Sequence, residues 1–163
     1  MVLYLLDANV MIRAHEDYYP IDRIPQFWTW LVGLGTNGTV KVPYEIYREI
    51  AVSTGPLHDW LTDPAVSAVM LLEMTTDPNH LNQILTGGYA PDLNDSEIEE
   101  IGQDPFLIAY ALANTAETTI VTKEVSAPSK QRANRRVPDV CRAFNIRCIN
   151  DFEFYRELDF KIS

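Results

Sequence analysis

The chain opens with five consecutive apolar residues, Val2 to Leu6, and this run ends at Asp7. A continuous apolar run that stops at a polar residue is typical of a strand buried on both faces of a parallel sheet. Strands in such a sheet are joined by helical crossovers, so we expect strands to alternate with helices along the chain. Asp7 would then lie at the carboxyl end of the first strand, where open α/β sheets bind ligands.

The later sequence shows this alternation. Strands are predicted at residues 39–42, 118–122 and 147–149, and helices at 25–34, 44–52, 104–113, 138–144 and from 151 onward. Ser96 with Glu99 has the spacing of a capping box at the start of another helix. Glycines and prolines cut residues 53–95 into short pieces, which we interpret as a helical excursion. Its one apolar segment, residues 65–74, fits either a helix or a strand.

Size and composition predict a single domain, residues 1–163. A chain of this length that is 47% hydrophobic can bury one sizeable core. No stretch approaches the ~18 apolar residues of a membrane span, and the first apolar run is too short for a signal peptide, so we expect a cytoplasmic protein. Cys141 and Cys148 form no partner motif and favour reduced thiols. The three histidines lack the close pairing of zinc sites, so we expect no zinc.

Four acidic residues stand where a parallel sheet would bring them together. Asp7 and Glu124 follow predicted strands, while Asp104 begins a helix and Glu49 lies within one. Several carboxylates share a small volume only if a cation offsets their repulsion, and oxygen ligands favour Mg²⁺ or Mn²⁺. Such a metal acidifies a bound water and neutralises charge on a phosphodiester. The pattern therefore predicts metal-dependent phosphodiester hydrolysis, with these four residues as catalytic and metal-binding groups.

Each of these acids also has a simpler explanation. Asp104 fits a helix N-cap, and Glu124 fits a surface charge after a strand. Glu49 fits a solvated helix residue, and Glu45, one turn earlier, competes with it for any ligand role. Asp7 is harder to explain otherwise, because an acid directly after five apolar residues is either a strand-end turn residue or a site residue.

Four segments follow one another along almost the whole chain. They are Tyr-Leu-Leu-Asp-Ala-Asn-Val at 4–10, Val-Pro-Tyr-Glu-Ile-Tyr-Arg-Glu-Ile at 42–50, Asp-Pro-Phe-Leu-Ile-Ala-Tyr-Ala-Leu-Ala at 104–113 and Thr-Ile-Val-Thr-Lys-Glu at 119–124. In kind and order they resemble the PIN-domain family, which includes the VapC-type ribonuclease toxins. The resemblance implies a PIN-like α/β fold: a three-layer α/β/α domain around a parallel sheet of four to five strands, in a divergent subgroup.

The resemblance also implies a function. The acidic Mg²⁺ or Mn²⁺ site would consist of Asp7, Glu49, Asp104 and Glu124, and the polar residues that orient it would be Asn9 and Thr122. The family usually has Asp where this chain has Glu124, whose longer side chain would reach a metal directly or through water. The protein would be an endoribonuclease, the toxin of a type II toxin–antitoxin pair, with an RNA substrate, a cognate antitoxin and, as one option, a homodimeric state. Asp139 would be an auxiliary acid or a first-turn helix residue that interacts with the helix dipole.

Basic residues cluster after Glu124 in a chain whose net charge is −10. Seven of the thirteen Lys and Arg lie in residues 123–147, against two acidic residues. These cations either hold RNA phosphates beside the acidic site or form a solvated mobile loop. The candidates for RNA binding are Lys123, Lys130, Arg132, Arg135 and Arg136.

Two other functions fit the same residues. A phosphatase would use Asp7 as a covalent nucleophile, although such enzymes normally have a second acid where this chain has Asn9. A catalytically silent PIN-like module would bind RNA or a protein, with Glu124 marking a decayed site. Apolar residues crowd an early helix more densely than one buried stripe requires, so we expect some to stay exposed for a protein partner, with core packing as the alternative for at least half of them. These are Phe27, Trp28, Trp30 and Leu31.

Overall fold

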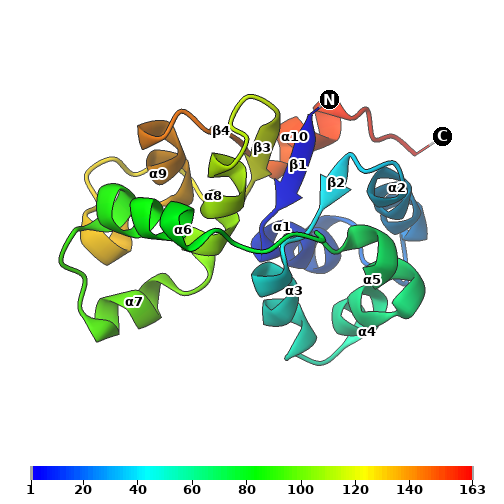
Figure 1. Ribbon diagram of the computed structural model, residues 1–163. Coiled ribbons are helices and arrows are strands. Elements are labelled where there is room, and N and C mark those ends of the chain that lie inside the picture. The colour runs from blue at the N-terminus through cyan, green and yellow to red at the C-terminus, as the bar shows by residue number, and fades with distance from the viewer. Residues whose placement is uncertain (1, 163) are drawn as a thin grey trace.

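A four-stranded parallel sheet lies at the centre of the computed structural model, which describes residues 2–162 (Figure 1). The strands are β1 (Leu3–Leu6), β2 (Val40–Lys41), β3 (Thr118–Val121) and β4 (Arg147–Ile149). Their order is β2-β1-β3-β4, and every pairing is parallel. The structure therefore confirms the predicted α/β class and the three-layer arrangement, with four strands.

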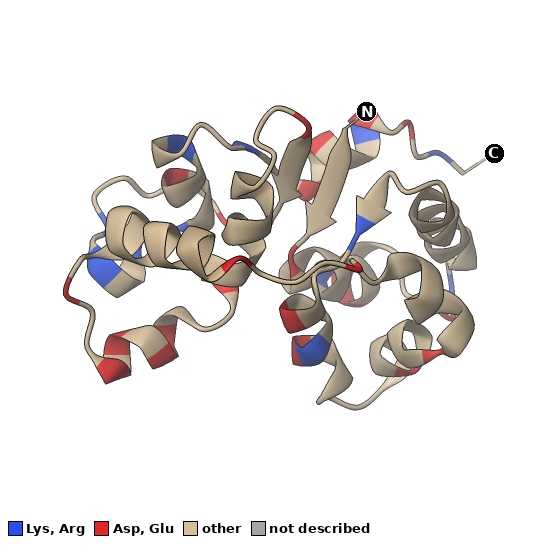
Figure 2. Ribbon diagram, in the orientation of Figure 1, with Lys and Arg blue, Asp and Glu red and all other residues tan. Residues whose placement is uncertain are grey.

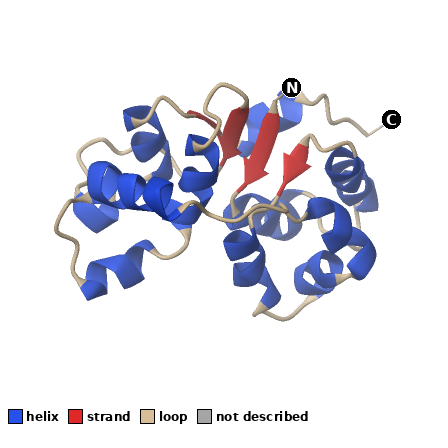
Figure 3. Ribbon diagram, viewed as in Figure 1, coloured by secondary structure: helices blue, strands red, loops and turns tan. Residues whose placement is uncertain are grey.

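Helices connect the strands and surround the sheet (Figure 3). They are α1 (Ala8–Arg13), α2 (Pro25–Thr36), α3 (Tyr44–Ala51), α4 (Pro56–Thr62), α5 (Pro64–Met70), α6 (Pro78–Gln83), α7 (Asp95–Ile101), α8 (Asp104–Leu112), α9 (Val137–Ala143) and α10 (Asp151–Glu157). Two π-helical turns, Ala14–Tyr18 and Ile84–Tyr89, continue α1 and α6, and a 3-10 turn spans Arg132–Asn134. None of the helices between residues 2 and 162 is long and apolar enough to cross a membrane.

Side-chain alternation along β1 assigns helices to the two faces of the sheet. The ring of Tyr4 lies 5.5 Å from that of Phe154 in α10. Leu3 and Leu5 instead line a cavity of about 200 Å³ together with Tyr110 of α8. Because successive side chains of a strand point to opposite faces, α8 and α10 cover opposite sides of the sheet.

The crowded apolar residues of α2 are packed against the core, so the prediction that some of them remain exposed for a partner is wrong and core packing is the correct explanation. Phe27, Trp28 and Leu31 are buried, and Trp30 is half-buried. The ring of Trp28 lies 4.7 Å from that of Trp60 in α4, while Phe27 lies 5.3 Å from Tyr155 in α10. A helix with neighbours on two sides buries more than one stripe of its surface, which accounts for the crowding.

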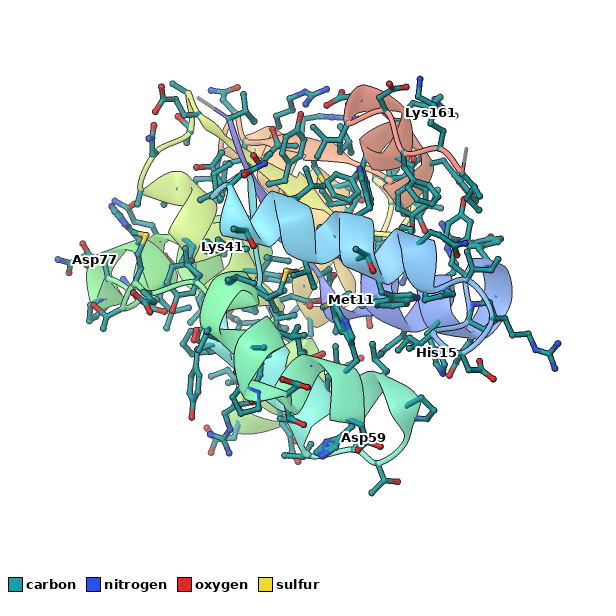
Figure 4. All side chains as sticks on the ribbon, turned by 90° about the vertical axis from the view of Figure 1, so that its right-hand side faces the viewer. Met11, His15, Lys41, Asp59, Asp77 and Lys161 are labelled. Atoms are coloured by element: carbon teal, nitrogen blue, oxygen red, sulfur yellow. The ribbon has the colours of Figure 1, made fainter. Side chains whose placement is uncertain are left out.

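Residues 53–95 form the helical excursion that the sequence predicts, and they add one contact to the sheet. The apolar segment 65–74 is helical as far as Met70, and Leu71 then forms a parallel bridge with Val42. Lys41 lies between α2 and α5 (Figure 4), where its Nζ donates to the carbonyls of Gly35 and Val69 at 3.2 and 2.6 Å. These contacts attach the excursion to the β2 edge of the sheet.

One helix start differs from the predicted one, and the explanation of Asp104 as a helix N-cap is wrong. The capping box of α7 uses Asn94 and Glu97, whereas Ser96 and Glu99 were predicted. Asn94 has the extended backbone that an N-cap requires, which places Ser96 inside the first turn. Asp104 is the first residue of α8 and not its N-cap, so its carboxylate does not cap the helix.

Candidate active site

The carboxyl ends of the strands bring together the acids that the sequence predicts. Asp7 follows β1 directly, and Glu124 follows the neighbouring strand β3. Asp104 begins α8, which packs against β3, and Glu49 lies on α3, the helix that follows β2. Acidic positions accordingly gather around the tip of β1 and on α3 (Figure 2).

Asp7 is buried and held by hydrogen bonds. Its Oδ2 accepts from the Thr122 hydroxyl at 3.0 Å and from the Asn9 amide at 3.2 Å. Asn9 Oδ1 in turn accepts from the backbone amide of Lys123, and Thr122 Oγ1 accepts from that of Glu124. Asn9 and Thr122 thus both donate hydrogen bonds to the carboxylate of Asp7, which the sequence expects them to orient. Through their own contacts with Lys123 and Glu124 they connect this carboxylate to the segment after β3.

The acids repel one another electrostatically. Burial, followed by the charge of Glu124, raises the pKa of Asp7 to about 6. Burial and the charges of Asp7, Glu124 and Glu49 raise the pKa of Asp104 to about 8. Glu49 is exposed as a residue, but partial loss of hydration at its carboxyl group and the charge of Asp7 raise its pKa to about 7. Near neutral pH, bound protons or a metal cation would relieve this repulsion among the carboxylates.

Glu124 has a structural contact in addition to its place among the acids. Its Oε2 accepts a 2.7 Å hydrogen bond from the backbone amide of Val137, the first residue of α9. Unpaired amides at a helix N-terminus favour a negative charge, so this contact stabilises the start of α9. The side chain therefore points toward α9 while remaining within electrostatic range of Asp7 and Asp104.

Carboxylate oxygens are suitable donors for Mg²⁺ or Mn²⁺, but their present arrangement is not a complete metal site. Within residues 2–162, no group of three or more His, Cys, Asp or Glu is arranged so that it could hold a metal ion. Binding by three or more of the four acids therefore requires a side chain to rotate. Glu49 and Glu124 have the longer and more flexible side chains, and Glu124 would have to leave or share its contact with Val137. The oxygen ligands of the acids thus suit a divalent cation in chemistry, and a side-chain rotation would complete its site.

Glu45, the alternative ligand on α3, is engaged elsewhere. Its Oε1 and Oε2 accept from the Tyr110 hydroxyl at 2.7 and 3.2 Å. This contact joins α3 to α8, the helices that carry Glu49 and Asp104. Burial, followed by hydrogen bonding to Glu45, raises the pKa of Tyr110 to about 12.

The five candidate cations occupy different environments. Arg132 forms ion pairs with Asp92 and Glu97, each at 2.8 Å. Arg135 donates to the backbone carbonyls of Gly88 and Asp139. Lys123 lines a cavity of about 360 Å³ beside Glu124. Lys130 and Arg136 line another cavity, of about 220 Å³, together with Asp104 and Glu124.

Asp139, whose role the sequence left open, holds the loop after β3. It lies in the first turn of α9 and accepts from the Ser126 hydroxyl and, at 2.8 Å, from the backbone amide of Ala127. Although burial opposes ionisation, these two hydrogen bonds lower the pKa of Asp139. Its carboxylate is thus occupied by the 124–127 segment.

Tyr89 belongs to the site although sequence reasoning missed it. It ends the π-helical turn Ile84–Tyr89 and lines the 220 Å³ cavity beside Asp104 and Glu124. Burial and the charge of Asp104 raise the pKa of its phenol far above the usual range. The only local signal is its position after Gly87 and Gly88, inside a segment whose order of helices could not be read.

Comparison with known sequences identifies one family. No curated protein and no solved structure matches the chain. A family model described as a domain of unknown function, DUF4411, matches residues 4–162. The match covers all the site residues described above. The chain therefore belongs to the DUF4411 family.

Proposed function

We propose that this protein is a metal-dependent endoribonuclease of the PIN-like type that uses Mg²⁺ or Mn²⁺. The observation that carries the proposal is electrostatic. Four acids, widely separated in sequence, interact through Asp7 and Asp104 at the carboxyl edge of a parallel sheet, and three have raised pKa values. Buried like charges cost stability, so their concentration supports a site for a cation.

The residues around the acids suit phosphodiester chemistry. A bound divalent metal would acidify a water molecule and neutralise charge on the phosphate. Asp7, fixed by Thr122 and Asn9, provides a rigid carboxylate at the base of the site. Lys130 and Arg136 provide positive charge for the RNA backbone. The carboxyl group of Asp104, with a pKa of about 8, can hold or release a proton at neutral pH.

We further propose that the protein acts in the cytoplasm as the toxin of a type II toxin–antitoxin pair. The support is the resemblance of four sequence segments to the VapC-type toxins, now joined by the proximity of their acids in the structure. A nuclease that cuts its own cell's RNA requires control, so a cognate antitoxin would block the site or the approach to it. A homodimer is compatible with this proposal.

A catalytically silent module that binds RNA or a protein is the second candidate. It is favoured by the contact between Glu124 and Val137 and by the lack, within residues 2–162, of three acids placed to hold one metal ion. The phosphatase alternative is weaker. Asp7 is only 4% exposed and already accepts two side-chain hydrogen bonds, which leaves little access for a covalent nucleophile.

Cleavage by purified protein separates these functions. Single-stranded and total cellular RNA would be incubated with Mg²⁺, with Mn²⁺ and with chelator, using the wild-type chain and an Asp7→Asn plus Asp104→Asn variant. We expect metal-dependent cleavage by the wild type alone. Growth would be measured on expression with and without the product of the neighbouring gene. Harmless expression together with no metal-dependent cleavage would reject the nuclease and favour the silent module.

A further inference from the structure

A buried hydroxyl without a hydrogen-bond partner lies beside the proposed active site. Within residues 2–162, the hydroxyls of Tyr89 and Tyr155 are buried and make no hydrogen bond. Buried polar groups in folded proteins nearly always have a partner, so each exception calls for an explanation. Only Tyr89 of these two lines a cavity shared with Asp104 and Glu124.

The backbone around Tyr89 is fixed by close packing against α9. A Cβ atom at Gly88 would lie 2.7 Å from Cγ1 of Val140, so a larger residue there would push the turn away. Arg135 also donates to the Gly88 carbonyl. The phenol is thus positioned by its backbone and its ring, while its hydroxyl has no internal partner.

The cavity presents donors suited to an anion. It measures about 220 Å³, and its polar lining consists of three acids and five other polar or basic residues: Glu100, Asp104, Glu124, Tyr89, Lys130, Asn134, Arg135 and Arg136. The side chains of Lys130 and Arg136 make no hydrogen bond or ion pair with the rest of residues 2–162, unlike Arg132 and Arg135. An ammonium and a guanidinium can only donate, and a phenol that keeps its proton can donate as well. A phosphate group, with several acceptor oxygens and negative charge, matches this set.

We propose that this cavity is a phosphate subsite, in which the Tyr89 hydroxyl, Lys130 and Arg136 hold a phosphate of the substrate strand beside Asp104 and Glu124. The inference rests on the proposed ribonuclease function and adds to it the place of a backbone phosphate. The hydroxyl is buried in the structure, so a phosphate reaches it only when a neighbouring group moves aside. Tyr89 is then a binding residue whose hydroxyl gains its hydrogen bond only from the substrate.

The test compares Tyr89→Phe with Tyr155→Phe, because both changes remove a buried hydroxyl that has no partner. Binding of inorganic phosphate would be followed by ³¹P NMR. Binding of a labelled single-stranded RNA of about ten nucleotides would be followed by fluorescence anisotropy. Unfolding by urea would be measured for each chain. For Tyr89→Phe we expect about tenfold weaker binding of phosphate and RNA with no loss of stability, since no internal hydrogen bond is removed. Tyr155→Phe should bind as the wild type does.

The outcomes separate the subsite from the nuclease. If Tyr89→Phe binds phosphate and RNA like the wild type, or if its main effect is reduced stability, the phosphate subsite is rejected even where RNA is cleaved. If phosphate binds the wild type but not Tyr89→Phe while no RNA is cut, the subsite stands and the nuclease is rejected. If the wild type binds neither phosphate nor RNA, the subsite is rejected.

Discussion

The carboxylate of Glu124 accepts a hydrogen bond from the backbone amide of Val137, so an acid of the proposed active site also stabilises the first turn of α9. The two contributions can be separated by mutation. Glu124→Gln keeps a carbonyl oxygen for the amide of Val137 but removes the charge, whereas Glu124→Ala removes both. We expect Glu124→Ala to be about 0.5–2 kcal/mol less stable than Glu124→Gln, the usual effect of losing a helix cap. Glu124→Gln should lose little stability.

Urea unfolding and RNA cleavage, measured on both variants, check this prediction. Both should cleave RNA much more slowly than the wild type, because each lacks the charge of Glu124. Equal stability of the two variants would show that the hydrogen bond to Val137 contributes nothing, and undiminished cleavage by Glu124→Gln would remove this residue from the site.

The raised pKa values predict how stability depends on pH in the absence of metal. Asp7, Glu49 and Asp104 bind protons more tightly in the folded chain than in the unfolded chain, where such groups titrate near pH 4. Their contribution is complete below about pH 4 and is lost as the pH rises through about 6 to 8. We expect a loss of several kcal/mol across this window, because each unit by which a pKa is raised costs about 1.4 kcal/mol once the group is deprotonated.

Thermal unfolding at pH 5 and pH 8, with and without Mn²⁺, measures this effect. A cation that replaces the released protons should raise the Tm far more at pH 8 than at pH 5, because it binds the deprotonated acids of the folded chain. A shift in Tm that is the same at both pH values would contradict a cation site formed by these residues.

Asp7→Asn and Asp139→Asn should change stability in opposite directions. Both aspartates are about 95% buried, but burial and Glu124 raise the pKa of Asp7, while hydrogen bonds from Ser126 and Ala127 lower that of Asp139. Without metal at pH 8, Asp7→Asn should therefore stabilise the chain by about 1 kcal/mol, and Asp139→Asn should destabilise it by a similar amount. Urea denaturation curves at pH 8 provide the comparison, and a destabilised Asp7→Asn variant would contradict the repulsion among the acids.

Lys130 and Arg136 should account for more of the salt dependence of RNA binding than Arg132 does. The charge of Arg132 is already matched by Asp92 and Glu97, so the single variant Arg132→Gln serves as the control. Replacing both Lys130 and Arg136 by Gln should reduce the slope of log K against log salt by about 1.4, since each phosphate that a cation neutralises on a single strand adds about 0.7. Anisotropy titrations at several salt concentrations measure this slope. A larger change in Arg132→Gln would place the RNA on the other side of the loop.

The sequence was informative wherever the end of a strand determines the position of a site residue. Val2–Leu6 and residues 118–122 predicted β1 and β3, and parallel pairing then required Asp7 and Glu124 to lie at one edge. The periods of the apolar residues also located α3 and α8 within a residue or two. Local patterns were sufficient here because shifting a strand by one residue moves every side chain to the opposite face of the sheet. Few other pairing registers would therefore bury the same apolar residues.

Interactions between distant surface residues could not be predicted. Arg132 and Arg136 look equivalent in sequence, and only the folded path of residues 92–97 brings Asp92 and Glu97 to Arg132. The helix α1 was missed because only six residues, Ala8–Arg13, form it before the π-helical turn begins. Tyr89 was missed because its place depends on the close approach of Gly88 to Val140.

The hydrogen bond from Tyr110 to Glu45 joins the two helices that carry Asp104 and Glu49. The hydroxyl remains a donor throughout the titration of these acids, because the pKa of Tyr110 is raised to about 12. The two halves of the site are therefore joined by a contact whose donor does not itself titrate between pH 6 and 8. The acids can therefore exchange protons for a cation while this hydrogen bond between α3 and α8 persists. The charge of the site changes, but the distance between the two helices that carry Asp104 and Glu49 does not.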